Sequence, residues 1–265
     1  MKKFLICCAT FMFFAASFAN EYKELLKAAN IGDAHAQYEL GLCYEFGKGV
    51  AKDEVEAVKW YRKAAEQGIA KAQFALGVCY YYGRGVAEDA KEAVKWYRKS
   101  ADQGYAHAQR NIGDCYSRGT GVTRNKHSAA KWYRKAAEQG DVLAQFYLGC
   151  YCQFDSIRGS KNEKEAIKWY RKAAEQRFVR AQRNIGVCYQ YGMGGVSRNE
   201  KEAVRWYRKA AEQGDTLAQI DLGNCYLKGI GVSKNKSKAV YWYKQAAKKG
   251  DTDAKAKLKE LGYSY

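Results

Sequence analysis

The chain has 265 residues, a formal net charge of +18 at pH 7 and no proline. It also contains no low-complexity run and no segment with the composition of a linker. These features exclude a set of domains joined by flexible tethers, and they predict one domain after the N-terminal leader.

Residues 1–19, MKKFLICCATFMFFAASFA, have the pattern of a secretory signal peptide. Lys2 and Lys3 form the basic start, and a short apolar stretch follows from Phe4 to Phe18. The segment Ser17-Phe18-Ala19 suits signal-peptidase cleavage before Asn20. We therefore expect an exported protein, periplasmic or secreted, with the envelope of a Gram-negative bacterium as its site of action.

The leader has two other interpretations: a lipoprotein signal, or a membrane anchor that is not cleaved. Cys7 and Cys8 come too early for a lipoprotein signal, and Leu5-Ile6 fits poorly with the small residues that such signals use. An uncleaved membrane anchor is the other alternative. No later stretch is apolar enough to cross a membrane, so we expect no transmembrane segment after cleavage.

A segment of 36 residues, 32–67, recurs without a gap along the rest of the chain. The further full copies are residues 68–103, 104–139, 140–176, 177–213 and 214–249, and two of them carry one extra residue. Residues 20–31 resemble the second half of a copy and residues 250–265 the first half, so we expect both to be capping helices. A fixed period of this length predicts a solenoid.

Each copy contains two apolar stripes with steps of three and four residues, which predict two α-helices. In the first copy the stripes are Ala36, Leu40, Cys43 and Tyr44, then Ala57, Trp60, Tyr61, Ala64 and Ala65. Gly47 and Gly49 end the first helix, because glycine tolerates positive φ. The second helix begins after an N-cap residue, which is Asp53, Asn125, Asn162, Asn199 or Asn235. The sequence therefore predicts an all-α fold of stacked helix–turn–helix units.

These residues resemble the Sel-one-like repeat, a relative of the tetratricopeptide repeat. The shared pattern is A-x-x-x-L-G-x-x-Y-x-x-G-x-G-V-x-x-[DN]-x-x-x-A-x-x-W-Y-x-x-A-A-x-x-G. The resemblance implies a right-handed α-solenoid that binds other proteins or assembles complexes. It also implies that the first helices line the concave surface.

The first helices vary more than the second, as a binding surface should. Helical geometry places two positions of each first helix opposite its apolar stripe. Residues from these positions and from the positions beside them form the candidate protein-binding groove: Tyr38, Leu42, Phe74, Val78, Arg110, Asn111, Phe146, Tyr147, Arg183 and Asn184. Aromatic residues and arginine are favoured at protein interfaces. The alternative is that Tyr38, Phe74 and Phe146 fill gaps between neighbouring first helices.

Seven cysteines follow the leader, and five share one repeat position: Cys43, Cys79, Cys115, Cys188 and Cys225. Equivalent positions of stacked units lie about 10 Å apart, which is too far for a disulfide, so we expect small core residues. Some exported relatives carry one cysteine on each helix of a repeat and bond the two within the unit. This chain has no cysteine on a second helix, so the resemblance implies no such disulfides here. Cys150 lies off the apolar stripe and is a candidate free thiol.

Each second helix carries basic residues opposite its apolar stripe, as in Lys59, Arg62 and Lys63. Stacking would turn them into a basic outer face that attracts an anionic envelope polymer. The simpler alternative is a solvated face. The export signal argues against nucleic acid as a partner.

Signals for catalysis are weak, and we expect no catalytic, metal or cofactor site. His35, His107 and His127 show no metal-ligand spacing. Some cysteine-rich relatives have been assigned penicillin binding or β-lactamase activity, so a β-lactamase-like hydrolase is the enzyme alternative. Ser128-x-x-Lys131 and Ser233-x-x-Lys236 have the serine-x-x-lysine spacing, but the companion motifs are missing. We expect an adaptor that binds a protein or peptide.

Overall fold

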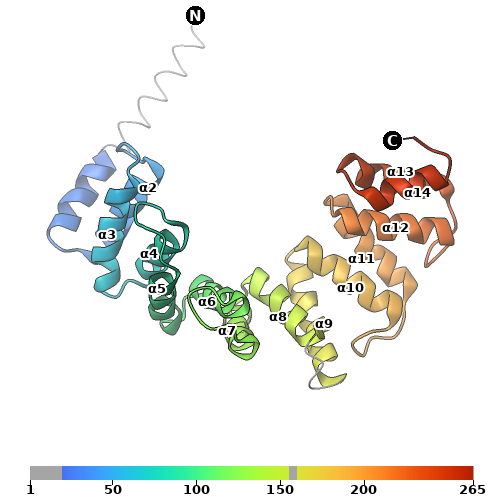
Figure 1. The fold of residues 1–265 in the computed structure, drawn as a ribbon, viewed down its shortest axis with the longest axis horizontal. Coiled ribbons are helices and arrows are strands. Elements are labelled where there is room, and N and C mark those ends of the chain that lie inside the picture. The colour runs from blue at the N-terminus through green and yellow to red at the C-terminus, as the bar shows by residue number, and fades with distance from the viewer. Residues whose placement is uncertain (1–19, 155–159, 265) are drawn as a thin grey trace, which may run out of the picture. The chain divides into compact units, whose positions relative to one another are not determined.

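The computed structural model describes residues 20–154 and 160–264, and the regular elements in these ranges are α-helices (Figure 1). The all-α prediction is therefore confirmed for the described residues. The expected signal peptide lies outside them. The helices form two compact units, residues up to 139 and residues from 140 onward. The expectation of one continuous domain stays a prediction.

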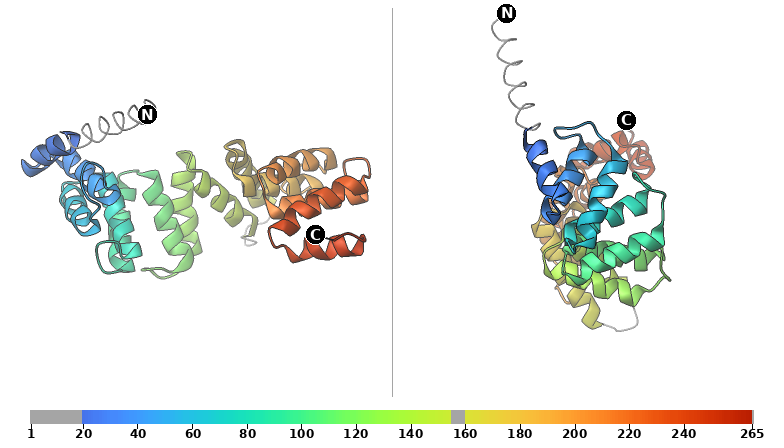
Figure 2. Two further views of the ribbon diagram at one scale, coloured as in Figure 1. Left: turned by 90° about the horizontal axis from the view of Figure 1, so that it is seen from above. Right: turned by 90° about the vertical axis from the view of Figure 1, so that its left-hand side faces the viewer.

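The first unit consists of a helix over residues 20–30 followed by helical pairs. The pairs are α2 (Ala34–Phe46) with α3 (Glu54–Glu66), α4 (Ala70–Tyr82) with α5 (Ala90–Asp102), and α6 (Ala106–Arg118) with α7 (Lys126–Glu138). Each helix packs against the next one along the chain, both within a pair and between pairs (Figure 2). The predicted first and second helices are thus present in each copy of this unit.

The second unit repeats the same arrangement. Its helices are α8 (Val142–Phe154), α9 (Ser160–Glu175), α10 (Val179–Tyr191), α11 (Glu200–Glu212), α12 (Thr216–Lys228), α13 (Lys236–Lys248) and α14 (Thr252–Glu260). The helix α14 buries Ala254 and Leu258 against the preceding pair, as expected of a C-terminal cap.

Capping side chains define where most second helices begin. Asp53 accepts hydrogen bonds from the backbone of Val55 and Glu56, and Asn125 accepts one from Ser128. Asn199 and Asn235 act in the same way on α11 and α13. The predicted N-cap at Asn162 is wrong, because α9 begins at Ser160 and Asn162 lies inside the helix.

The core of both units is built from the two predicted stripes. Tyrosines of the second helices are its largest fully buried side chains: Tyr61, Tyr97, Tyr133, Tyr170, Tyr207 and Tyr243. In the first unit the tryptophan of a copy reaches the preceding copy, so that Trp96 joins the cluster formed by Leu76 and Tyr61. Neighbouring copies within a unit therefore share one core, which is why a single copy could not fold alone.

The second glycine of the turn allows consecutive copies to touch through their backbones at Gly85, Gly121 and Gly231. Gly85 has a φ of +64°, and a Cβ on it would overlap the carbonyl of Glu54 at the start of α3. The Gly-x-Gly turn is thus required by contact with the preceding copy as well as by helix termination.

Candidate partner-binding surface

The buried tyrosines of the second helices carry their hydroxyls to the first helices. Tyr61 donates to Glu45, and Tyr133 donates to Asp114 at 2.6 Å. The second unit has the same bonds, from Tyr170 to Gln153 at 2.7 Å, from Tyr207 to Gln190 at 2.7 Å and from Tyr243 to Asn224 at 2.8 Å. Each bond fixes a polar side chain of a first helix, so the surface of these helices is held in place from beneath.

The ten residues of the predicted groove are all half-buried in the structure. Their aromatic rings pack against the buried tyrosines, with centroid distances of 5.9 Å for Tyr38 to Tyr61 and 5.8 Å for Phe74 to Tyr97. Phe146 lies 5.9 Å from Tyr170 and 5.7 Å from its neighbour Tyr147. These rings therefore support the first helices as well as contributing to their surface.

The other groove residues also make contacts within the protein. Leu42 and Val78 pack against core clusters. Asn111 is hydrogen-bonded to Tyr97, and Asn184 to Tyr170. The guanidinium Nε of Arg183 lies 2.7 Å from Asp221 on the next first helix. Arg110 is half-buried beside Asn111.

Among the residues whose exposure the structure describes, the most exposed aromatic side chains of the first helices were not predicted from the sequence. They lie at the last helical position, with exposed fractions of 62% for Phe46, 60% for Tyr82 and 65% for Tyr191. Cations of the following turn approach two of the rings: Lys48 lies 5.8 Å from the centroid of Phe46, and Arg84 lies 5.0 Å from that of Tyr82. The sequence did contain a signal for these exposed rings: each is an aromatic residue that lies off the apolar stripe and directly precedes the glycine of the turn.

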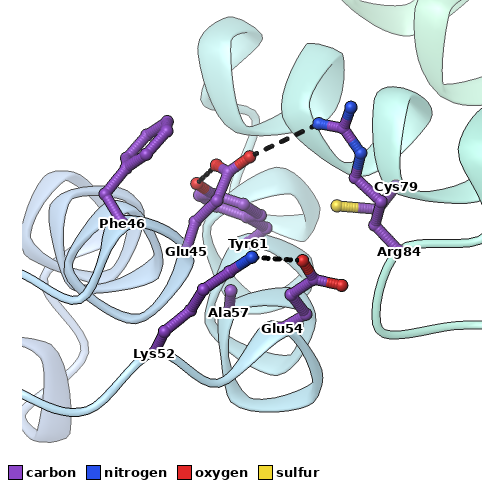
Figure 3. Close-up of a pocket in the computed structure, with 8 residues that line it drawn as sticks. All are labelled: Glu45, Phe46, Lys52, Glu54, Ala57, Tyr61, Cys79 and Arg84. Carbon is purple, nitrogen blue, oxygen red and sulfur yellow. Dashed lines mark hydrogen bonds and ion pairs between the residues drawn. The ribbon is translucent and has the colours of Figure 1, made fainter.

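A cavity of about 360 Å³ lies beside Phe46, between the first two copies (Figure 3). It is lined by Glu45, Phe46, Lys52, Glu54, Ala57, Tyr61, Cys79 and Arg84. Lys52 lies 2.7 Å from Glu54, and Arg84 lies 4.0 Å from Glu45. The volume is sufficient for one or two side chains of a partner.

The cysteines beneath this surface are poor nucleophiles. Cys79 is buried, and burial raises its pKa to about 12, so the thiolate is scarce at neutral pH. The five cysteines that share a repeat position form no disulfide and are buried, as predicted. Cys150 is half-buried and hydrogen-bonded to Tyr170, and burial raises the pKa of its thiol.

The basic residues of the second helices are largely engaged in contacts within the protein. Arg62 donates to the hydroxyl of Tyr80 on the next first helix at 2.6 Å. Lys63 stacks over its own Trp60, with its Nζ 3.8 Å from the ring centroid, and Lys59 pairs with Glu56. The same arginine-to-tyrosine bonds join Arg98 to Tyr116, Arg171 to Tyr189, and Arg208 to Tyr226. These contacts within the protein explain why many of the basic residues are present, so binding of an anionic polymer is not needed to explain them.

Pairs of glutamines join the two helices of a copy, and the sequence analysis did not identify them. Gln73, only 5% exposed, donates to the carbonyl of Ala65 and accepts a bond from Gln103 at 2.7 Å. Gln103 also donates to the carbonyl of Gly68 at 2.9 Å. The amides satisfy backbone groups at two helix ends, so their role is structural.

Across residues 20–154 and 160–264, no group of three histidine, cysteine, aspartate or glutamate side chains is placed to hold a metal ion. In the same ranges, no helix combines the length and apolarity needed to span a bilayer.

Each described unit is thus a stack of helical pairs whose neighbouring copies share a core. This is the architecture of an α-solenoid. The chain belongs to the Sel1 repeat family, whose model matches residues 34–69, 70–105, 106–141, 142–178, 179–215 and 216–251. This match confirms the resemblance and the predicted solenoid fold. Repeat proteins of this kind are generally protein-interaction scaffolds.

Two solved structures are similar to the chain over most of its length. One is a protective antigen of uropathogenic Escherichia coli, with a TM-score of 0.85 and 37% identity over 92% of this chain. The chain covers 53% of that antigen, about half its length. The other is a Sel1 repeat protein from Oxalobacter formigenes, with a TM-score of 0.77, 33% identity, and coverage of 94% of this chain and 74% of that one. None of the curated proteins compared with the chain matches it.

Proposed function

We propose that the protein is an interaction adaptor that binds a protein or peptide on the first helices of its first unit. The observation that carries this proposal is the exposed ring of Phe46 in the lining of the 360 Å³ cavity, together with the exposed ring of Tyr82, which lies 5.0 Å from the lining residue Arg84. They occupy equivalent positions in consecutive copies, so one partner segment can contact both. We name Phe46, Tyr82 and the cavity the aromatic edge.

The chemistry of the aromatic edge is that of a protein interface. Interfaces are enriched in aromatic residues and arginine, and hot spots occur where such side chains border a pocket. The aromatic edge combines two exposed rings with Arg84, whose ion pair to Glu45 is long at 4.0 Å. A carboxylate of the partner can therefore compete for this arginine.

The support beneath the aromatic edge keeps the cost of binding low. The hydrogen bond from Tyr61 fixes Glu45, and the turn after α4 is packed on the backbone of α3 through Gly85. A surface that is already ordered loses little conformational entropy when a partner binds. Four residues of the predicted groove, Tyr38, Leu42, Phe74 and Val78, lie on the same two first helices, α2 and α4.

We also propose, from the sequence alone, that the protein acts outside the cytoplasm. Residues 1–19 carry the expected export signal. Mass determination of the protein isolated from its own source tests this directly. A mature N-terminus at Asn20 supports export, whereas an intact Met1 start in the cytoplasmic fraction contradicts it.

A capture experiment tests the adaptor proposal. The chain from Asn20 is used as bait against an extract of its own source, alongside a Phe46→Ala/Tyr82→Ala bait. Both side chains are exposed, so the double variant should fold normally. Tyr241→Ala is the matched control, because Tyr241 is 55% exposed and lies on a second helix.

The proposal predicts that a discrete protein is captured by the first bait and the control but lost with the double variant. Equal capture by all three baits would place the contact elsewhere. Capture of polyanions alone, abolished by salt, would favour the basic outer face instead.

A further inference from the structure

The repeat departs from its own pattern at residue 177. The corresponding residue in the other copies and in the C-terminal cap is a glycine with φ between +90° and +99°: Gly32, Gly68, Gly104, Gly140, Gly214 and Gly250. Arg177 has φ +66° and is the single non-glycine residue with positive φ in the described parts of the chain. A side chain in this conformation is strained, and such strain is concentrated at functional sites.

The departure changes the hydrogen bonding of the glutamine that closes the same copy. Gln67, Gln103, Gln139 and Gln176 each donate to the carbonyl of the glycine that opens their copy. Gln213, the corresponding residue, donates to the carbonyl of Lys209 at 3.0 Å instead. It keeps only the bond to Gln182, at 2.7 Å. The side chain has thus turned away from residue 177.

A cavity of about 580 Å³ lies at this point, within the second unit. It is lined by Ala174, Glu175, Arg177, Gln182, Trp206, Lys209, Glu212 and Gln213. Trp206 is half-buried, as is Trp242 of the last copy, whereas Trp60, Trp96, Trp132 and Trp169 at the equivalent position are buried. The change of residue, the moved amide and a half-buried indole therefore meet at this cavity.

The lining is balanced in charge and rich in planar polar groups. Arg177 and Lys209 are cationic, Glu175 and Glu212 are anionic, and Gln182 and Gln213 carry amides. An anionic ligand would meet the two carboxylates, and a cationic ligand would meet Arg177 and Lys209. An apolar ligand would leave polar groups desolvated without partners.

We propose that this pocket binds a neutral saccharide. A sugar offers hydroxyl donors and acceptors to the carboxylates, guanidinium and amides at once, and it presents an apolar C–H face to the indole of Trp206. Lys209 lies 4.1 Å from the centroid of that ring, but its side chain is exposed and its ammonium can move into water when a ligand arrives.

The test uses the full chain and sugars that differ in charge. Isothermal titration and saturation-transfer NMR are run with glucose, galactose, N-acetylglucosamine and the β-1,4-linked disaccharides of each. Glucosamine supplies the cation and glucuronate the anion. At least one neutral sugar should bind, and its charged relatives should bind about tenfold more weakly or worse.

Two variants connect binding to the pocket. Arg177→Gly restores the repeat and should let Gln213 bond the residue-177 carbonyl, so binding should fall by about tenfold or more while the fold is kept. Glu212→Gln should weaken binding, whereas Glu138→Gln, at the equivalent position of the first unit, should not. Failure of every neutral sugar to bind overturns the proposal. So does equal binding of the charged sugars, or unchanged affinity in Arg177→Gly.

Discussion

The ring of Tyr97 lies against the backbone of Gly77 so closely that a Cβ atom on this glycine would be 2.6 Å from Cδ1 of the ring. The same relation holds in every copy, with corresponding distances of 2.5–2.8 Å at Gly41, Gly113, Gly149, Gly186 and Gly223. Because the glycine of each first helix has no side chain, the tyrosine ring of the same copy's second helix can pack directly against its backbone. This contact sets how closely the two helices of a copy approach.

Substitution of Gly77 by alanine should therefore destabilise the protein although alanine is the better helix former. Overpacking costs about 1–3 kcal/mol, and the gain in helix propensity returns up to about 1 kcal/mol. We expect Gly77→Ala to lower the free energy of unfolding by about 1–2 kcal/mol, measured by urea denaturation.

A double-mutant cycle supplies the control for this prediction. In a Tyr97→Val background the δ- and ε-carbons that the new methyl group would strike are absent. Gly77→Ala should then be neutral or stabilising. An equal loss of stability in both backgrounds would show that the ring is not the cause.

The glutamine pairs predict a stabilising substitution at the end of the last copy. Gln219 is buried and its Oε1 has no hydrogen-bond partner, because Lys249 replaces the glutamine that would donate to it. Lys249 instead bonds the carbonyl of Gly214. Lys249→Gln can supply both bonds and should raise the free energy of unfolding by about 1 kcal/mol.

The reverse substitution in the first unit is the matched control. Gln139 donates to Gln109 at 2.8 Å and to the carbonyl of Gly104 at 2.9 Å. Gln139→Lys should leave the Gln109 oxygen buried and unpaired, at a cost of about 1–3 kcal/mol. If both substitutions leave the denaturation midpoint unchanged, the amide pairs contribute nothing to stability.

The contrast between these two features shows what periodicity could and could not predict. Gly77 and Tyr97 belong to the repeated apolar pattern, so their helices and buried faces followed from three- and four-residue steps. Gln73 lies on the same buried face, but a polar side chain gives no hydrophobic signal. Its partner Gln103 is 30 residues away, and only the stacked structure brings the amides together.

The candidate surface was predicted only in part for a related reason. Helical spacing placed Tyr38 and Phe74 opposite the apolar stripe, but it could not show that their rings turn toward Tyr61 and Tyr97. Helical spacing also could not predict that Phe46 and Tyr82, the last residues of their helices, are exposed to solvent. Such orientations depend on how neighbouring copies pack.

The strain at Arg177 can be measured independently of any ligand. A left-handed conformation costs a residue with a side chain about 1–2 kcal/mol, and glycine adopts it freely. Arg177→Gly should therefore raise the free energy of unfolding by about 1 kcal/mol, although introducing a glycine usually lowers it. Lower stability of this variant would mean that arginine is accommodated without strain.

The buried thiols predict a loss of stability in alkaline solution. Burial raises the pKa of Cys79, Cys115 and Cys225 to about 12 in the folded protein. In the unfolded chain the cysteine pKa is about 8.5, so the unfolded state releases these protons first. The stabilisation from the neutral buried thiols is complete below about pH 8.5 and is lost progressively as the pH rises toward 12.

Each such cysteine should lower the free energy of unfolding by about 1 kcal/mol per pH unit within that window. Urea denaturation at pH 7.5, 9 and 10 measures the slope. The Cys79→Ala variant should show a shallower slope, whatever its stability at neutral pH. A stability that is constant over this range would contradict the assigned burial of the thiols.

Site-specific photo-crosslinking shows directly whether the aromatic edge of the first unit contacts a partner. A photoreactive phenylalanine analogue is placed at Tyr82 and, in a separate control protein, at Tyr241, which is similarly exposed on a second helix. After irradiation in the native source, we expect one discrete adduct from position 82 that is absent at position 241. Adducts at position 241 alone, or the same adducts at both positions, would contradict it.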